Sequence, residues 1–223
     1  MHITGTYYTY NGQAEQDKFV LSILKQKRNG FFLEIGSNDP ININNTYKLE
    51  KEFGWRGIMV EYTASYLPAY KTHRPNSIHV INDATKINYA ELFAKSNVPA
   101  AVDYLQIDLE VSNGSTLLTL KALDEQVMDR YTFATVTFEH DIYTGDHFST
   151  RSKSREIFER RGYIHAFKDI HNDNNSKFVY EDWYVHPDLV DMEYVNRIKA
   201  VNDKNYENSP TTGQSIAWGR IEY

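Results

Sequence analysis

The chain has 223 residues, of which 41% are hydrophobic and 24% charged, and its formal net charge at pH 7 is -6. The length and composition are ordinary for one globular domain, here taken as residues 1–223. The absence of cysteine excludes disulfides, thiolate zinc sites and thiol nucleophiles, and the acidic balance argues against a nucleic-acid partner, because neutralising phosphates requires a basic surface.

Helical and apolar segments alternate along the first two thirds of the chain. In chain order, the pattern predicts helix 13–28, strand 31–35, helix 46–53, strand 57–61, helix 64–73, strand 77–81, helix 89–95, strand 102–107, helix 115–123, strand 133–138 and helix 150–161. Five strands that alternate with helices are typical of an α/β protein with a parallel, doubly wound, Rossmann-like sheet.

The pattern changes after this last helix. Residues 163–168 and 178–185 are predicted as strands with no helix between them, and the polar linker 171–176 suits an antiparallel pair. A helix over 187–201 and a last strand over 215–221 follow. We therefore expect a mostly parallel sheet, flanked by helices, with an antiparallel hairpin near its C-terminal end.

The sequence shows no sign of membrane association. Residues 1–6 lack the basic start and apolar run of a signal peptide, and no apolar stretch has the length needed to span a bilayer. We expect a cytoplasmic protein with no membrane partner. The oligomeric state is not predicted by these features.

Ligands in such sheets bind beyond the carboxyl ends of the strands, where the strand order reverses. The first strand ends with Glu34 and is followed by Gly36, and the second ends with Glu61, which is 61 − 36 = 25 residues further on. An acid about 20 residues after the glycine turn binds a ribose diol in dinucleotide folds. We therefore place Glu34, Gly36, Glu61 and the adjacent Tyr62 in a cofactor site, with a rim glutamate that binds no ligand as the alternative for Glu61.

The turn after the first strand distinguishes between cofactors. A dinucleotide site needs three glycines, because the backbone must approach a pyrophosphate. Here Gly36 is followed by Ser37, Asn38 and Asp39. S-adenosylmethionine has no phosphate, and its sulfonium and ammonium groups suit a polar, acidic turn. Ser37 and Asn38 therefore join the predicted cofactor site, and a nicotinamide-dependent oxidoreductase remains the alternative.

Three later strand ends also carry polar residues. Asp83 and Ala84 follow the third strand and are predicted to bind adenine through the carboxylate and a backbone N–H, unless Asp83 is a plain turn residue. Asp108 follows the fourth strand, and Glu139 and His140 lie at the end of the fifth. Buried carboxylates at strand ends are costly unless they bind something, so these residues are predicted to form the catalytic mouth.

The sequence also resembles a known family. The segments that carry this resemblance are QDKFV at 16–20, GFFLEIG at 30–36, residues 45–50, GWRGI at 54–58, residues 60–61, YLQIDLE at 104–110, FEH at 138–140, RGY at 161–163 and EDWYV at 181–185. In their order and spacing they resemble the FkbM-type methyltransferases, over residues 13–187. The chain departs from the family's pattern at Ser37–Pro40 and at Val111, where the family usually has glycine.

The resemblance implies a class I methyltransferase fold that binds S-adenosylmethionine and methylates a hydroxyl, often on a sugar or glycan. A small hydroxylated metabolite is the alternative acceptor. Carried over by position, the resemblance places these residues at the cofactor or the reacting centre: Gly36, Glu61, Asp83 and Asp108, with Asn45 and Thr46 near the amino-acid end of the cofactor.

Two catalytic arrangements fit these residues. His140 is the best general base by residue type, because its ordinary pKa lies nearest neutral, and Glu139 then orients it or binds a neighbouring hydroxyl. Alternatively, Asp108, Glu139 and Asp141 hold a divalent cation, Mg²⁺ or Mn²⁺, which binds and acidifies a hydroxyl. A structural role for His140, and a non-catalytic role for the whole chain as a partner-binding subunit, also remain open.

Overall fold

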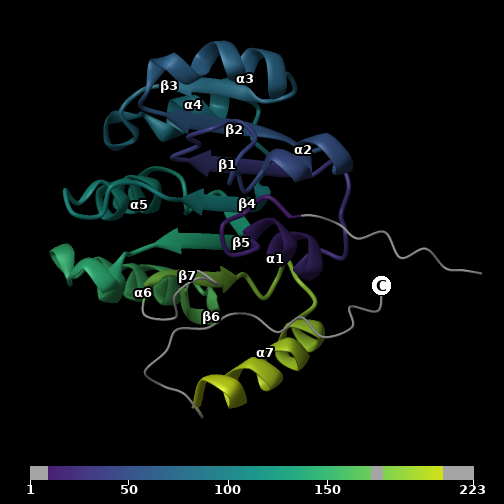
Figure 1. Cartoon of the computed structure of the whole chain (residues 1–223), viewed down its shortest axis with the longest axis vertical. Coiled ribbons are helices and arrows are strands. Elements are labelled where there is room, and N and C mark those ends of the chain that lie inside the picture. Colours follow the sequence, from purple (N-terminus) through teal and green to yellow (C-terminus); the bar gives the residue numbers. More distant parts are fainter. Residues whose placement is uncertain (1–9, 172–177, 208–223) are drawn as a thin grey trace, which may run out of the picture.

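A seven-stranded sheet forms the centre of the protein (Figure 1), shown here by a computed structural model that describes residues 10–171 and 178–207. The strand order is β3-β2-β1-β4-β5-β7-β6, with β1 to β5 parallel and β7 antiparallel to both its neighbours. The strands are β1 (Phe31–Ile35), β2 (Arg56–Glu61), β3 (Ile78–Ile81), β4 (Ala101–Ile107), β5 (Thr132–Glu139), β6 (Ile164–His171) and β7 (Val179–Val185). The predicted α/β architecture, mostly parallel with a C-terminal antiparallel hairpin, is confirmed.

Helices cover both faces of this sheet. The helices are α1 (Gln16–Ile23), α2 (Tyr47–Phe53), α3 (Leu67–His73), α4 (Tyr89–Lys95), α5 (Ser115–Gln126), α6 (Thr150–Arg160) and α7 (Met192–Glu207). One core layer packs α4, α5 and α6 against the sheet, and the other packs α1, α2, α3 and α7 against the opposite face. None of the helices within residues 10–171 and 178–207 is long and apolar enough to cross a membrane.

The first strand shows why the sheet is buried on both sides. All five residues of β1 are buried. Phe31, Leu33 and Ile35 contribute to the core layer under α5, whereas Phe32 contributes to the layer under α1 and α2. This alternation is the two-residue period of a strand, and a continuous apolar run is typical of a parallel strand with helices on both faces.

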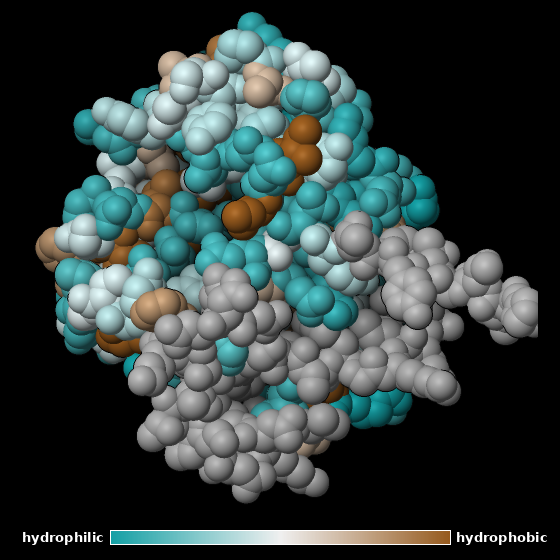
Figure 2. All heavy atoms as spheres, in the orientation of Figure 1, coloured by the Kyte–Doolittle hydropathy of each residue, from teal (hydrophilic) through white to brown (hydrophobic). Residues whose placement is uncertain are grey.

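Hydrophilic side chains cover most of the described surface in the view of Figure 2, and hydrophobic side chains form only narrow strips there. The large apolar residues instead fill the two core layers. The interior therefore accounts for most of the aromatic content of the described chain.

Several helix boundaries differ from the prediction, and two of the differences have a clear cause in the structure. The first helix ends at Ile23 because Lys25 and Gln26 adopt left-handed backbone angles. The Lys27 carbonyl, which lies after the helix, accepts a hydrogen bond from the Trp55 indole at 2.7 Å. The last helix begins at Met192 rather than at residue 187, because the Asp191 carboxylate caps its first turn. The predicted strand 215–221 lies outside the described residues.

Phe158 gives a direct test of the layer under α6. Its ring is fully buried and packs against the rings of Phe138, Tyr163 and Tyr184, with centroids 5.8, 5.4 and 4.4 Å away. We expect Phe158→Ala to lower the free energy of unfolding by about 3–5 kcal/mol, because it leaves a cavity that rigid neighbours cannot fill. Urea unfolding measures this, with Phe158→Leu as the milder control. A loss below about 1 kcal/mol would contradict the packing described.

Candidate functional site

Two adjoining cavities lie beyond the carboxyl ends of the parallel strands. The larger, of about 620 Å³, opens next to the ends of β1, β2, β4 and β5. The smaller, of about 470 Å³, lies next to the ends of β2, β3 and β4, and Leu109 lines both. Strand order reverses between β1 and β4, so the cavities are where the topology of an open α/β sheet places a ligand.

Most of the residues predicted for the site meet at these cavities. The larger is lined by Glu34, Gly36, Ser37, Asn38, Asn45, Glu61, Asp108 and Glu139. The smaller is lined by Tyr62, Asp83 and Ala84. Thr46 and His140 line neither.

Gly36 brings two strands together at the floor of the larger cavity. Its φ is +88°, and a Cβ at this position would lie 1.7 Å from the Asp108 carbonyl oxygen. The Asp108 N–H donates to the Ile35 carbonyl at 3.0 Å, and the Gly36 N–H donates to the Val60 carbonyl at 2.9 Å. Only glycine permits this approach, which sets the spacing between the β1 and β4 ends.

Glu61 ties two loops to the wall of the cavity. One carboxylate oxygen accepts from the Asn38 N–H at 2.9 Å and the other from the Thr63 N–H at 2.7 Å. The side chain is nearly buried yet lines the cavity. A carboxylate oxygen can accept more than one hydrogen bond, so Glu61 remains able to accept hydroxyls from a ligand.

Asp83 is held by its own turn. One of its oxygens accepts from the Thr85 N–H and hydroxyl at 3.0 and 2.6 Å, and Lys86 lies 2.9 Å from the other. The hydrogen bonds from Thr85 and Lys86 lower its pKa to about 2. Asp83 is thus an ionised turn residue at the wall of the smaller cavity. Tyr62, on the same wall, is 76% exposed.

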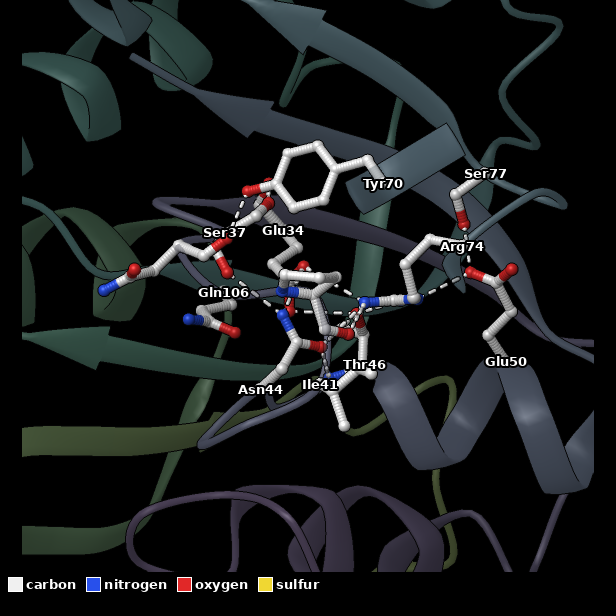
Figure 3. Close-up of polar contacts among 12 residues, drawn as sticks. Glu34, Ser37, Ile41, Asn44, Thr46, Glu50, Tyr70, Arg74, Ser77 and Gln106 are labelled. Atoms are coloured by element: carbon white, nitrogen blue, oxygen red, sulfur yellow. Dashed lines mark hydrogen bonds and ion pairs between the residues drawn. The ribbon is translucent and has the colours of Figure 1, made fainter. Parts of the chain in front are cut away.

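A buried guanidinium lies behind the larger cavity (Figure 3). The Arg74 side chain is fully buried and donates to Glu50 at 2.9 Å, to Asn44 at 2.8 Å and to the Thr46 hydroxyl at 2.6 Å. Thr46 in turn donates to a Glu34 oxygen at 2.9 Å. Thr46 therefore lies in a supporting layer, where it fixes Glu34, and does not line the cavity.

Two acceptor atoms on the cavity wall have no hydrogen-bond partner. Asn45 Oδ1 and Gln106 Oε1 are both buried and unpartnered among the described residues, and both residues line the larger cavity. A buried acceptor without a donor costs about 1–3 kcal/mol. Both residues line the cavity, although the two oxygens themselves are shielded from solvent.

Asp108 and Glu139 form a carboxyl pair on the cavity floor. Burial raises the pKa of Asp108, although a hydrogen bond with Glu139 and one from Gln106 oppose the rise. Burial and then the Asp108 charge raise the pKa of Glu139 well above its ordinary range. Burial and mutual repulsion therefore disfavour the state in which both carboxyls are charged.

His140 lies away from both cavities. Its side chain is fully buried, Nε2 is 3.5 Å from an Asp182 oxygen, and Nδ1 accepts from the Ile142 N–H at 3.3 Å. His140 follows Glu139 directly, and successive side chains of an extended segment point to opposite faces of the sheet. This geometry does not suit a base acting on an acceptor in the cavity, and it corresponds to the structural role left open by the sequence.

The cation arrangement is not preformed either. Within residues 10–171 and 178–207, the group that brings three candidate metal ligands within 4.8 Å of one another is His140, Asp169 and Asp182, not the strand-end acids. Arg151 and Arg155 donate to the Asp169 carboxylate at 2.6 and 2.8 Å. Guanidinium groups thus already supply positive charge to this second cluster.

Three residues of the site were missed by the sequence reasoning. Asn44 donates to Glu34 and to the Ser37 carbonyl, Gln106 lines the cavity, and Arg74 binds Asn44, Thr46 and Glu50 behind it. Strand alternation places Gln106 on the same side of β4 as Tyr104, one residue from the carboxyl end of the strand. That position was a signal from which Gln106 could have been predicted as a site residue. No local pattern marks Arg74, because its partners lie 24 to 30 residues earlier in the chain.

Comparisons with known proteins support the fold. The chain matches a proposed rRNA methylase from Clostridium thermocellum with a TM-score of 0.52 and 11% identity, over 80% of this chain and 97% of that one. Together with the strand order, this shows that the chain has the Rossmann-like fold of class I methyltransferases.

Further solved structures resemble the chain less closely by TM-score. They include a TehB-like S-adenosylmethionine-dependent methyltransferase from Corynebacterium glutamicum (11% identity, 81% and 89% of the two chains, TM-score 0.48) and a methyltransferase from Archaeoglobus fulgidus (16%, 91% and 89%, 0.47). No protein-family model matches the chain, and no curated protein sequence matches it.

Gly36→Ala tests the close approach on the cavity floor. Gly162 serves as the matched control, because its φ of +84° is similar but the nearest atom to an added Cβ is 3.7 Å away. We expect Gly162→Ala to cost about 1 kcal/mol of stability through the left-handed backbone alone. Gly36→Ala should cost about 1–3 kcal/mol more, because the β1 and β4 ends must separate. Equal losses in urea unfolding would contradict this account.

The buried Glu181 carboxyl should make the free energy of unfolding depend on pH. Burial raises its pKa from 4.5 to about 8, despite hydrogen bonds from Trp183 and Gln16. Between these values the folded chain keeps a proton that the unfolded chain has lost, so the free energy of unfolding falls as pH rises.

Glu181→Gln removes this proton, and we expect the decline in stability between pH 5 and pH 8 to become shallower than in the wild type. Urea unfolding at both pH values measures the change. Glu159→Gln, at an exposed position of α6, is the control and should leave the slope unchanged. A slope in Glu181→Gln as steep as in the wild type would refute the assignment.

Proposed function

We propose that the protein is an S-adenosylmethionine-dependent O-methyltransferase that acts on a hydroxyl of a sugar or glycan. The observation that carries the proposal is the set of groups around the larger cavity. Glu61, Asn45, Gln106, Asp108 and Glu139 all line one cavity at the switch point of a methyltransferase-type sheet.

The charges around the cavities favour this cofactor over a dinucleotide. Among the described residues, neither cavity is lined by a lysine or an arginine. A pyrophosphate would meet only carboxylates and neutral groups there, which is electrostatically unfavourable. The sulfonium and ammonium of S-adenosylmethionine instead suit the acidic walls. This argues against the nicotinamide-dependent alternative.

Each part of the cofactor has a fitting group. Glu61 would accept the ribose hydroxyls, while Asn45 Oδ1 and Gln106 Oε1 would accept hydrogen bonds from the ammonium. Tyr62, Asp83 and Ala84 would surround the adenine in the smaller cavity. This division follows the two cavities that meet at Leu109.

The carboxyl pair supports the chemistry. The cofactor supplies an activated methyl group when bound, so the chain itself must orient the acceptor oxygen and take its proton. Asp108 and Glu139 both line the larger cavity, where the ionised carboxylate of either residue would accept this proton. We assign them this role in place of His140.

The acceptor class rests on the resemblance to FkbM-type methyltransferases, whose members often act on sugars or glycosylated products. Several hydroxyl-binding carboxylates near the cavity agree with a polyhydroxylated acceptor. A small hydroxylated metabolite of another kind fits the same carboxyl pair and remains the second candidate.

The first test is cofactor binding and transfer. We expect S-adenosylhomocysteine to bind in calorimetry and to raise the melting temperature, with no effect of NAD(H). Labelled S-adenosylmethionine should transfer its methyl group to members of a panel of free and polymer-bound sugars. Absence of both binding and transfer would sink the proposal.

Glu139→Gln and Asp108→Asn test the carboxyl pair. Each should lower kcat by about 10²–10⁴-fold, because a general base is lost, while the affinity for S-adenosylhomocysteine under Glu139→Gln stays close to that of the wild type. The wild-type rate should rise with pH, because burial and the Asp108 charge raise the pKa of Glu139 and a general base must be ionised. Glu159→Gln is the control, and wild-type turnover by Glu139→Gln would reject the assigned role.

A further inference from the structure

Two half-exposed aromatic rings contact each other beyond the end of β5. Tyr143 is 47% exposed and Phe178 is 48% exposed. Their ring centroids are 5.1 Å apart, with an angle of 49° between the planes. Single exposed aromatics are common on protein surfaces, whereas these two rings form one contiguous exposed patch.

The backbone holds this pair next to the catalytic floor. Tyr143 lies in the short helical turn Ile142–Thr144, a few residues after Glu139, and Phe178 directly precedes β7. The Asp141 N–H donates to the Tyr180 carbonyl at 2.9 Å, which fastens the two segments to each other. The rings therefore stand at the same edge of the sheet as the carboxyl of Glu139.

Carboxylates surround the Tyr143 ring. Burial, followed by the nearby Asp141, Glu139 and Glu110 carboxylates, raises the pKa of the Tyr143 phenol. Glu139 lines the larger cavity and Glu110 the smaller. Neither ring lines either cavity, but the pair lies beyond the end of β5 that carries Glu139. The three carboxylates that act on Tyr143 disfavour an anionic ligand there.

The shape of the pair favours a puckered ring over a flat one. Two rings inclined at 49° form an open corner, which cannot enclose a planar ring on both faces. A pyranose ring offers C–H groups on its face, which pack against the electron-rich face of an aromatic ring. Its edge carries hydroxyls, which the neighbouring carboxylates can accept.

We propose that Tyr143 and Phe178 form the acceptor subsite and bind the pyranose ring of an uncharged sugar, with one hydroxyl directed to the Asp108–Glu139 pair. The inference rests on the proposed methyltransferase function. It adds the residues that select the acceptor, and it excludes sugar phosphates and uronic acids as substrates.

Binding without turnover gives the sharpest test. The full chain, saturated with S-adenosylhomocysteine, is examined by saturation-transfer difference NMR with methyl α-D-mannopyranoside, methyl α-L-rhamnopyranoside and methyl β-D-galactopyranoside. Glucose 6-phosphate, glucuronic acid and catechol serve as the anionic and planar probes. We expect signals from at least one neutral glycoside, strongest for its ring C–H protons, and none from the anionic probes.

The variants are Tyr143→Ala and Phe178→Ala, with Tyr143→Phe as the conservative change. Ile164→Ala is the control, because Ile164 is a partly exposed residue at the opposite end of the sheet, paired with Val185. The alanine variants should weaken glycoside binding and raise KM by roughly 10-fold, with kcat less affected. Tyr143→Phe and Ile164→Ala should behave like the wild type, and all four should bind S-adenosylhomocysteine normally.

The outcomes separate the two proposals. Three results would overturn the acceptor subsite if S-adenosylhomocysteine still binds normally: no glycoside signal, stronger signals from catechol or the anionic sugars, or an unchanged KM in both alanine variants. Each of these results leaves the methyltransferase proposal standing. Failure of the wild type to bind S-adenosylhomocysteine overturns the methyltransferase proposal and, with it, this inference.

Discussion

The buried Arg74 guanidinium is the interaction on which the site depends. It lies between the fully buried carboxylates of Glu50 and Glu34, at 2.9 and 4.0 Å. Ser77 also donates to Glu50, at 2.7 Å, and thereby links the start of β3 to α2. A buried charge without its partner costs about 3–5 kcal/mol, so the loop after β1 can hardly move without disrupting this network. The cavity wall is therefore rigid before any ligand binds.

A second constraint acts on the floor of the same cavity. The contact between Gly36 and the Asp108 carbonyl places the ends of β1 and β4 side by side at the point where strand order reverses. Arg74 holds the end of the loop after β1 through Asn44 and Thr46. Gly36 holds the start of this loop against the Asp108 carbonyl. Between them, Glu61 bonds both the β1 and β2 loops. Preorganisation of this kind means that binding energy is not spent on ordering the loops.

The sequence allowed the fold to be predicted, and also that most of the candidate site residues meet at one edge of the sheet, because both depend on local signals. Apolar runs such as 31–35 and the strand-end acids Glu61 and Asp108 can be read directly, and parallel strands necessarily bring their carboxyl ends to one edge. His140 shows the limit of this reasoning. Its position after β5 was predicted correctly, but its direction depends on the antiparallel pairing with β7 and on Asp182, 42 residues away (182 − 140). Arg74 and the Tyr143–Phe178 contact are likewise long-range properties of the folded chain.

The buried acids lower the stability of the folded chain. Asp108, Glu139 and Glu181 all have raised pKa values, with burial as the largest cause, so each is less stable as a charged group here than in water. Hydrogen bonds from Gln16 and Trp183 to Glu181 offset part of that cost. The second cluster, around Asp182, shows the contrast: Arg155 and two histidines hold the pKa of Asp182 well below its ordinary range despite burial. The acids on the cavity floor are left without a cation among the described residues that line it, which is the condition expected of groups that exchange protons with a substrate.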